Sequence, residues 1–250
     1  MVNEKMARDL RALGIKNDDV ILMHSSLRSL GFVEGGADSV IDTLLSVLEN
    51  GTLLIPTLSY ASVTRSEPIF SIKETPSCVG KISEVFRKRD GVIRSVHPTH
   101  SVCGIGKYAE EILSRHIDTD TPAGENSPFA LLPKYNGKVL MLGCGLDPNT
   151  SMHGVEELVM PDYLLRDEMT EYTLIDADGN ERKKKYWPHY FHGEGFNAAQ
   201  RYHRLANVMD IAEGKVLEAT AYLIDAKTMW DKGYEALKMD SHYFVEIFKF

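Results

Sequence analysis

The sequence predicts an α/β fold in which helices pack on a buried sheet. Residues 20–23, 52–55 and 139–142 are short apolar runs with the length and composition of buried strands. Between the first two runs, residues 38–48 carry apolar side chains at helical spacing. A strand, a helix and a strand in succession are typical of a sheet covered by helices. We therefore expect one α/β domain over residues 1–250.

Composition narrows the class of protein. The chain is 43% hydrophobic and 26% charged with a net charge of −8, which disfavours nucleic acid as a partner because that needs clustered Lys and Arg. The acidic balance suits a cationic substrate or simply solubility. Three cysteines without CxxC spacing indicate a reducing cytoplasm, and no zinc or other metal site is expected. We expect neither a secretory signal nor a membrane span.

The first half of the chain alternates helical and strand patterns. Residues 4–13 form an amphipathic helix that ends at Gly14, the strand of residues 52–55 stops at Pro56, and residues 80–89 resume a helix. Residues 59–76 are polar and irregular, which predicts a long surface loop of a kind that is often functional.

The second half is less regular. We expect helices at residues 107–115, 196–209 and 227–237, a strand at 172–175 with a hairpin turn at 176–180, and a strand or strand–helix junction at 214–224. Residues 187–196 are rich in aromatic side chains and histidine. Core packing is their default explanation, and a substrate wall is the alternative.

Ser25, Ser26, Leu27 and Arg28 follow the first strand directly. Hydroxyls and free N–H groups at the carboxyl end of a strand, near a helix start, favour anions, and an arginine can grip a phosphate. The stretch is neither a Walker loop nor GxGxxG, so the serines could equally cap and turn the chain.

A second polar stretch, residues 92–102, combines Arg94, Ser95, His97, His100 and Ser101 around a bend fixed by Pro98. It reads equally well as an edge strand with a turn and as a wall of an anion-binding cleft.

A His-x-x-Glu pair follows the strand at residues 139–142. His153 and Glu156 share one face of a predicted helix, because residues three apart lie one above the other. On spacing alone a solvated surface pair is the more common outcome. The functional interpretation is a base and its orienting carboxylate at a sheet edge.

Four stretches taken together resemble the aminoglycoside 3-N-acetyltransferase family. Residues 24–45 are similar to its opening, 75–106 to its Arg-Ser-x-His-Pro signature, and 124–129 and 142–157 to the next two motifs, in the same order. Residues 214–233 resemble the closing region more loosely. The resemblance covers most of the chain.

The resemblance implies a three-layer α/β/α sandwich around a central mixed sheet, and not the GNAT fold. It implies an acetyl-coenzyme A-dependent N-acetyltransferase without a metal, whose histidine base falls on His153 with Glu156 beside it. The coenzyme-binding stretches of the family fall on two groups of residues, Ser25, Ser26, Leu27 and Arg28, and Arg94, Ser95, His97 and Ser101.

The expected reaction is direct attack by a primary amine of an aminoglycoside on the thioester, because histidine can take a proton near neutral pH. An amino sugar or another small amine is the alternative acceptor. A hydrolase lacks support from G-x-S-x-G or HExxH motifs, and a coenzyme-binding protein without catalysis leaves the His153–Glu156 pair unexplained. A homodimer would be unsurprising.

Overall fold

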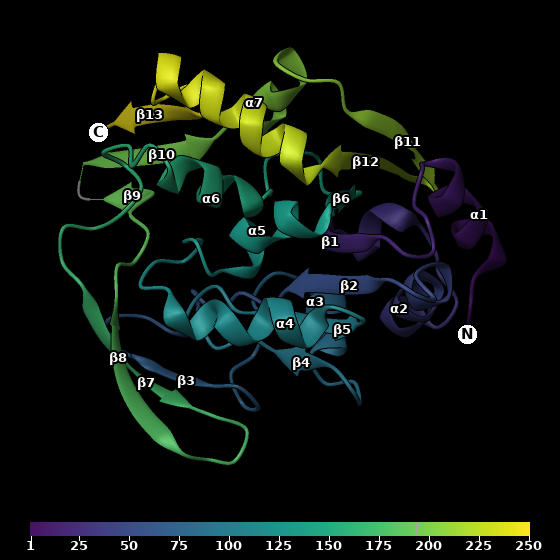
Figure 1. The fold of residues 1–250 in the computed structure, drawn as a ribbon, viewed down its shortest axis with the longest axis horizontal. Helices are drawn as coiled ribbons and strands as arrows, with labels where there is room; N and C mark the ends of the chain where they lie inside the picture. The colour runs from purple at the N-terminus through teal and green to yellow at the C-terminus, as the bar shows by residue number, and fades with distance from the viewer. Residues whose placement is uncertain (194) are drawn as a thin grey trace.

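Three parallel strands form the centre of the fold in the computed structural model, which describes residues 1–193 and 195–250 (Figure 1). Strand β1 (Val20–Ser25) lies between β2 (Thr52–Pro56) and β6 (Lys138–Leu142) and is parallel to both. Their apolar runs are buried because helices cover both faces of the sheet, which is why these strands show no polar–apolar alternation. All three strands are as the sequence predicts.

Antiparallel strands extend this sheet on both sides. The order is β11-β12-β6-β1-β2-β5-β4, so the sheet is mixed. The outer strands are β11 (Ala212–Val216), β12 (Ala219–Asp225), β5 (Val102–Gly106) and β4 (Ile93–Arg94). The expectation of a central mixed sheet is confirmed.

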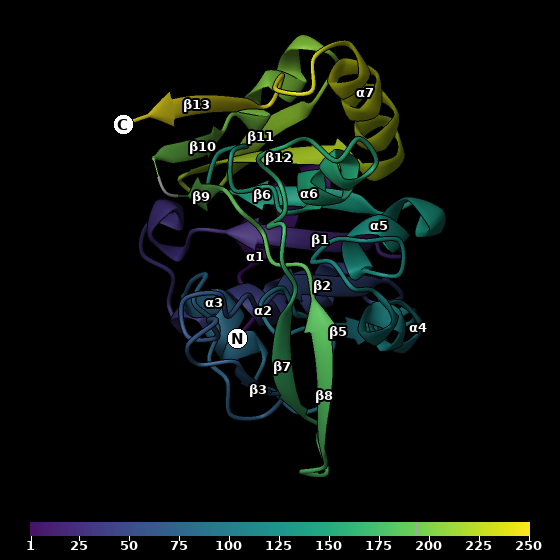
Figure 2. The same ribbon diagram turned by 90° about the vertical axis from the view of Figure 1, so that its left-hand side faces the viewer.

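Helices cover the two faces of the sheet (Figure 2). One face carries α1 (Glu4–Ala12), α2 (Gly36–Val47) and α3 (Lys81–Phe86), and the other carries α4 (Ala109–Ser114), α5 (Pro128–Leu131), α6 (Ser151–Glu157) and α7 (Ala226–Met239). Alternate residues of β1 divide between the two cores, because successive side chains of a strand point to opposite faces. Ile21 and Met23 pack in the first core, and Val20 and Leu22 in the second. The predicted three-layer α/β/α sandwich is therefore confirmed.

Four short 3₁₀ segments connect these elements. They are η1 (Leu27–Leu30), η2 (Arg115–Asp118), η3 (Leu132–Tyr135) and η4 (Tyr202–Asn207). Among the described residues, no helix is long and apolar enough to cross a membrane.

Two small sheets lie outside the sandwich. One contains β3 (Ile69–Ser71), β7 (Thr170–Ile175) and β8 (Glu181–Tyr186), and the β7–β8 hairpin projects away from the main sheet (Figures 1 and 2). Strand β3 lies within the stretch expected to be an irregular loop, where it pairs in parallel with β7. Residues 69–71 are therefore a strand because they pair with β7, which is distant in sequence, and the local pattern does not show this.

The other small sheet contains β9 (His192–Gly193), β10 (Phe196–Gln200) and β13 (Val245–Lys249). The helix expected at residues 196–209 is wrong, since this stretch forms β10 and η4 instead. Strand β10 pairs antiparallel with β13, and Ala198 is fully buried in a small core with Tyr163 and Val245. Tertiary pairing therefore overrides the helical pattern of the local sequence.

Candidate active site

A cavity of about 480 Å³ lies at the carboxyl ends of the parallel strands. Its lining includes His24 and Ser25 at the end of β1, Pro56 at the end of β2 and Cys144 just after β6. The carboxyl edge of parallel strands is the usual ligand position in open α/β sheets, because the loops diverge there. His153 of α6 reaches the same cavity.

His153 and Glu156 form a buried pair. Nδ1 of His153 lies 3.0 Å from Oε2 of Glu156, and the two residues are only 8% and 0% exposed. The interpretation of this pair as solvated surface therefore does not hold. Helix α6 can approach α7 closely because Gly154 has no side chain, and a Cβ there would lie 2.7 Å from the Trp230 ring.

Two tyrosines complete the surroundings of Glu156. The hydroxyl of Tyr202 donates to Oε2 and that of Tyr163 to Oε1, each over 2.8 Å. Burial, reinforced by the negative charge of Glu156, raises the pKa of both phenols, so they remain proton donors. With the carboxylate accepting, the Nδ1–H of His153 is a donor and its Nε2 keeps a free lone pair for the cavity.

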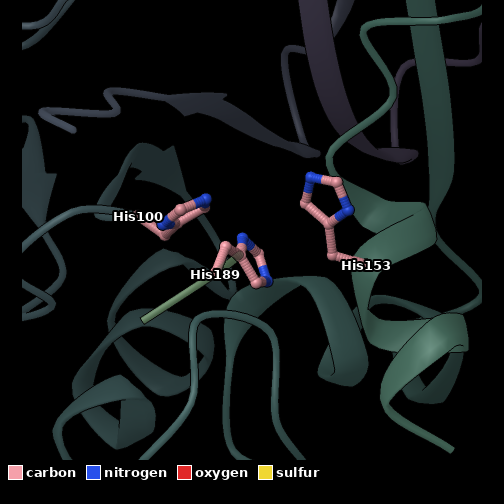
Figure 3. A group of neighbouring side chains, drawn as sticks. All are labelled: His100, His153 and His189. Carbon is pink, nitrogen blue, oxygen red and sulfur yellow. The ribbon is translucent and has the colours of Figure 1, made fainter. Parts of the chain in front are cut away.

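Besides His153 and His192, the cavity wall contains His24, His100 and His189. Burial lowers the pKa of His24 to about 3, with the charge of His153 as a second cause, and burial also lowers the pKa of His100 and of His189 well below the usual value. Neutral imidazoles therefore surround His153 at pH 7. Figure 3 shows the His100 and His189 rings beside each other, with His153 projecting from its helix.

Comparison with known proteins identifies the family of the chain. The sequence model described as aminoglycoside 3-N-acetyltransferase matches residues 22–238. The chain belongs to this family.

Curated proteins with aminoglycoside N-acetyltransferase names are similar to the chain in sequence. It is 34% identical over 174 residues to the prophage-derived aminoglycoside N(3')-acetyltransferase-like protein YokD of Bacillus subtilis, a match covering 61% of this chain and 64% of YokD. It is 31% identical over 216 residues to aminoglycoside N(3)-acetyltransferase IV of Salmonella sp, covering 86% and 79%. The chain thus spans less than two thirds of YokD in that sequence match.

The crystal structure of YokD has the same fold. It superposes with a TM-score of 0.80 at 27% identity, over 95% of this chain and 93% of that one. The shared fold holds over nearly the whole of both chains.

The serine stretch expected to bind coenzyme follows β1, and one of its residues lines the cavity. Ser25 lines it, while Ser26 precedes η1 and accepts a hydrogen bond from the Ser29 hydroxyl over 2.9 Å. Leu27 packs partly against the core, and Arg28 is exposed. Ser25, Ser26 and Arg28 are thus available to a ligand, and their role in coenzyme binding stays a prediction.

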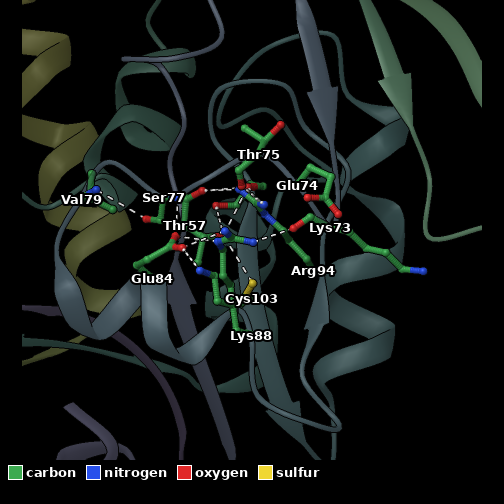
Figure 4. Close-up of polar contacts among 12 residues, drawn as sticks. Thr57, Lys73, Glu74, Thr75, Ser77, Val79, Glu84, Lys88, Arg94 and Cys103 are labelled. Atoms are coloured by element: carbon green, nitrogen blue, oxygen red, sulfur yellow. Dashed lines mark hydrogen bonds and ion pairs between the residues drawn. The ribbon is translucent and has the colours of Figure 1, made fainter. Parts of the chain in front are cut away.

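Arg94 does not line the cavity, contrary to the expectation of a coenzyme wall. Its guanidinium is buried and donates to the carbonyls of Thr57, Ile72 and Thr75 and to the Ser101 hydroxyl, over 2.6 to 3.1 Å. Figure 4 shows Arg94 among its neighbours, including Thr57 and Thr75. Burial lowers the pKa of Arg94 to about 10, so the group is still charged at neutral pH. These bonds direct the guanidinium to the protein's own carbonyls, which gives Arg94 and Ser101 a structural role here.

Ser95 and His97 are also enclosed in protein outside the cavity lining. The Ser95 hydroxyl contacts Nδ1 of His116 over 2.9 Å, and the His97 ring stacks on His116 at 4.9 Å between centroids. The neighbouring His100, which the motif did not single out, is the histidine of this stretch that reaches the cavity. His100 is thus the residue of this stretch in the cavity wall, and a role of the stretch in coenzyme binding stays a prediction.

The sequence analysis missed Tyr163, Tyr202 and His189 as site residues. Tyr202 fell within a stretch expected to be helical, and His189 within an aromatic stretch assigned by default to the core. The alternative interpretation of that stretch, a substrate wall, agrees with the positions of His189, Phe191 and His192 in the cavity lining.

Removing the Arg94 donors should destabilise the fold. We expect Arg94→Met to lower the free energy of unfolding by about 3–5 kcal/mol, because buried carbonyls would lose a charged partner. Urea unfolding measures this, with Arg28→Met as the exposed control expected to change stability by less than about 0.5 kcal/mol. Unchanged stability with weakened coenzyme binding would return Arg94 to the coenzyme site.

Buried His116 should make stability depend on pH. Burial lowers its folded pKa to about 3, below the roughly 6.5 of an unfolded chain, so the unfolded state takes up a proton first as pH falls. Its contribution is fully present above pH 6.5 and decreases by about 2 kcal/mol by pH 5. Urea unfolding at pH 7.5 and 5.0 measures how far the free energy of unfolding falls between the two pH values. This fall should be about 2 kcal/mol smaller in His116→Phe than in the wild-type chain. His192→Phe, at an exposed site without an ion pair among the described residues, should keep the wild-type fall. An unaltered fall in His116→Phe would refute the assignment.

Proposed function

We propose that this chain is an acetyl-coenzyme A-dependent N-acetyltransferase that acetylates a primary amine of an aminoglycoside, with His153 as general base. One observation carries the proposal: the buried carboxylate of Glu156 holds Nδ1 of His153 and leaves the other ring nitrogen free in the cavity. A carboxylate in this position fixes the tautomer and stabilises the imidazolium that forms.

The proposed chemistry follows from the protonation state of the substrate amine. A protonated amine has no lone pair, so it first gives up one proton to solvent. Nε2 of His153 then accepts a second proton from the nitrogen as it attacks the thioester carbonyl. The carbon–sulfur bond then breaks, and the coenzyme leaves as a thiol that takes the proton back from His153. Acetyl transfer is direct, because the thioester is already an activated acyl group.

Cys144 does not serve as an intermediate acyl carrier in this proposal. It lines the cavity, but burial raises the pKa of its thiol to about 11. Because the thiolate is the nucleophile, the thiol form at neutral pH is a poor one.

The relatives of the chain support an aminoglycoside acceptor. A solved structure 26% identical to this chain is a histidine-to-alanine mutant of aminoglycoside acetyltransferase AAC(3)-IVa in complex with a gentamicin, with a TM-score of 0.79. By analogy, the cavity beside His153 would hold the amine.

The charge of the cavity favours a second candidate acceptor, an amino sugar or other small amine with few positive charges. Among the described lining residues, Asp147 is the carboxylate, and it is already bonded to His203 over 2.8 Å. Arg166 lines the same cavity and lies over the Tyr190 ring. Several ammonium groups would find little compensating charge on these described walls.

Replacing the proposed base should abolish transfer but not coenzyme binding. We expect His153→Ala to reduce turnover by about 10²–10⁴ in a coenzyme A-release assay while calorimetry shows acetyl-coenzyme A binding largely retained. His242→Ala is the control, because His242 is exposed and bonded to Asp162 away from this cavity. Turnover at the wild-type rate in His153→Ala would eliminate His153 as the base.

Bulk in the serine stretch should block the coenzyme. We expect Ser25→Leu with Ser26→Leu to weaken acetyl-coenzyme A binding at least about tenfold, because two hydroxyls are lost and bulk is added. Calorimetry measures this, with His153→Ala as the matched variant that keeps affinity. Equal affinities in the two variants would place the coenzyme phosphates elsewhere.

A panel of amines separates the two acceptors. Gentamicin and other aminoglycosides are compared with monoamino sugars in the coenzyme A-release assay at equal concentration. The aminoglycoside proposal expects the highest kcat/KM for the polyamines. Higher kcat/KM for the monoamines would assign the second candidate.

A further inference from the structure

Three histidines from separate segments converge at the cavity. His100 precedes β5, His153 lies on α6 and His189 precedes β9. One nitrogen from each lies within 4.8 Å of those from the other two. Figure 3 shows the three rings around a common space. The acetyl-transfer proposal uses only His153, so the other two rings need an explanation.

The free nitrogens of this histidine cluster point to a ligand. His189 has both ring nitrogens buried, and neither has a hydrogen-bond partner among the described residues. A buried polar atom left unpaired costs about 1–3 kcal/mol, so such atoms usually meet a partner. His153 has Nε2 free because Glu156 occupies Nδ1, and His100 has Nε2 free because the Thr99 hydroxyl contacts its Nδ1 over 2.8 Å.

These contacts match the surroundings of histidine metal ligands. A ligating histidine commonly uses its other ring nitrogen to bond a carboxylate or another oxygen, which fixes the ring and the tautomer. Glu156 does this for His153 and Thr99 for His100. Three neutral nitrogen donors suit zinc and similar transition ions, whereas magnesium and calcium prefer oxygen.

The spacing of the three nitrogens permits closure on an ion. Zinc–nitrogen bonds of about 2.0–2.1 Å in a tetrahedron place the nitrogens about 3.3 Å apart. The present separations, within 4.8 Å, require each ring to move inward by roughly 1 Å, which side-chain rotation supplies. The fourth position would face the cavity and be open to water.

We propose that His100, His153 and His189 bind one Zn²⁺ ion, and that this ion inhibits acetyl transfer by occupying the lone pair of His153 Nε2. The inhibitory half rests on the proposed function, and the binding half does not. The sequence gives no metal motif because the three ligands lie on segments far apart in the chain. Zinc here is an inhibitor and not a cofactor.

Binding is tested on the full chain after dialysis against a chelator. Zinc calorimetry and Co²⁺ titration followed by visible absorption should each show one equivalent bound, with the absorption of a tetrahedral site. His189→Ala and His100→Ala should weaken Zn²⁺ binding at least tenfold. His189→Gln and His100→Gln repeat the test with side chains closer in size, and circular dichroism checks that each variant is folded.

Two matched controls define the site. His192→Ala and Cys144→Ser also change the wall of the cavity but lie outside the histidine cluster, so they should retain wild-type zinc affinity. No binding by the wild-type chain, equal affinity in the His189 and His100 variants, or loss of binding in Cys144→Ser would each overturn the proposal.

Inhibition is measured separately. Zinc should reduce wild-type turnover with half-inhibition near its dissociation constant, and excess chelator should restore it. The turnover of His189→Ala, whatever its size, should no longer fall at that zinc concentration. Zinc bound at the cluster without inhibition would overturn the inhibitory half. Loss of transfer in His153→Ala, together with no zinc binding by the wild-type chain, would leave the acetyltransferase standing and remove the zinc site.

Discussion

The buried carboxylate of Glu156 is the constraint on which the candidate site depends. A charge enclosed in protein is strongly unfavourable unless donors surround it, and here the donors are His153, Tyr163 and Tyr202. Because these donors come from α6, the turn after it and η4, the carboxylate ties three parts of the chain together. The orientation of the His153 ring is therefore a property of the tertiary structure and not of one helix.

Local sequence patterns predicted the α/β class, and the family resemblance implied the three-layer sandwich. Apolar runs identified β1, β2 and β6, and helical spacing identified α2 and α7. Local patterns failed where pairing partners are distant, since residues 196–200 have no strand pattern until β13 lies beside them. The pair at His153 and Glu156 was visible from its spacing, but its burial and the Tyr202 contact were not.

Arg94 illustrates why the type of a residue does not by itself identify its role. A guanidinium serves a phosphate and a group of carbonyls equally well, and only the position of its head decides between them. Here the head is enclosed between the end of β2 and the segment after β3, which it holds together. The cavity is left with neutral imidazoles and few charges on its described walls, so shape and hydrogen bonding would have a large share in selecting a ligand.

The close approach of Gly154 to Trp230 bears on how the protein matures during synthesis. Helix α6 leaves the ribosome well before α7 and η4, yet its neighbours Trp230 and Tyr202 belong to those later segments. Domains form as synthesis proceeds from the amino terminus. Early in synthesis, therefore, Gly154 of α6 would lack its neighbour Trp230, and the carboxylate of Glu156 would lack the Tyr202 donor. The nascent chain should therefore hold a largely formed sheet while the reactive centre assembles last, after most of the polypeptide has emerged.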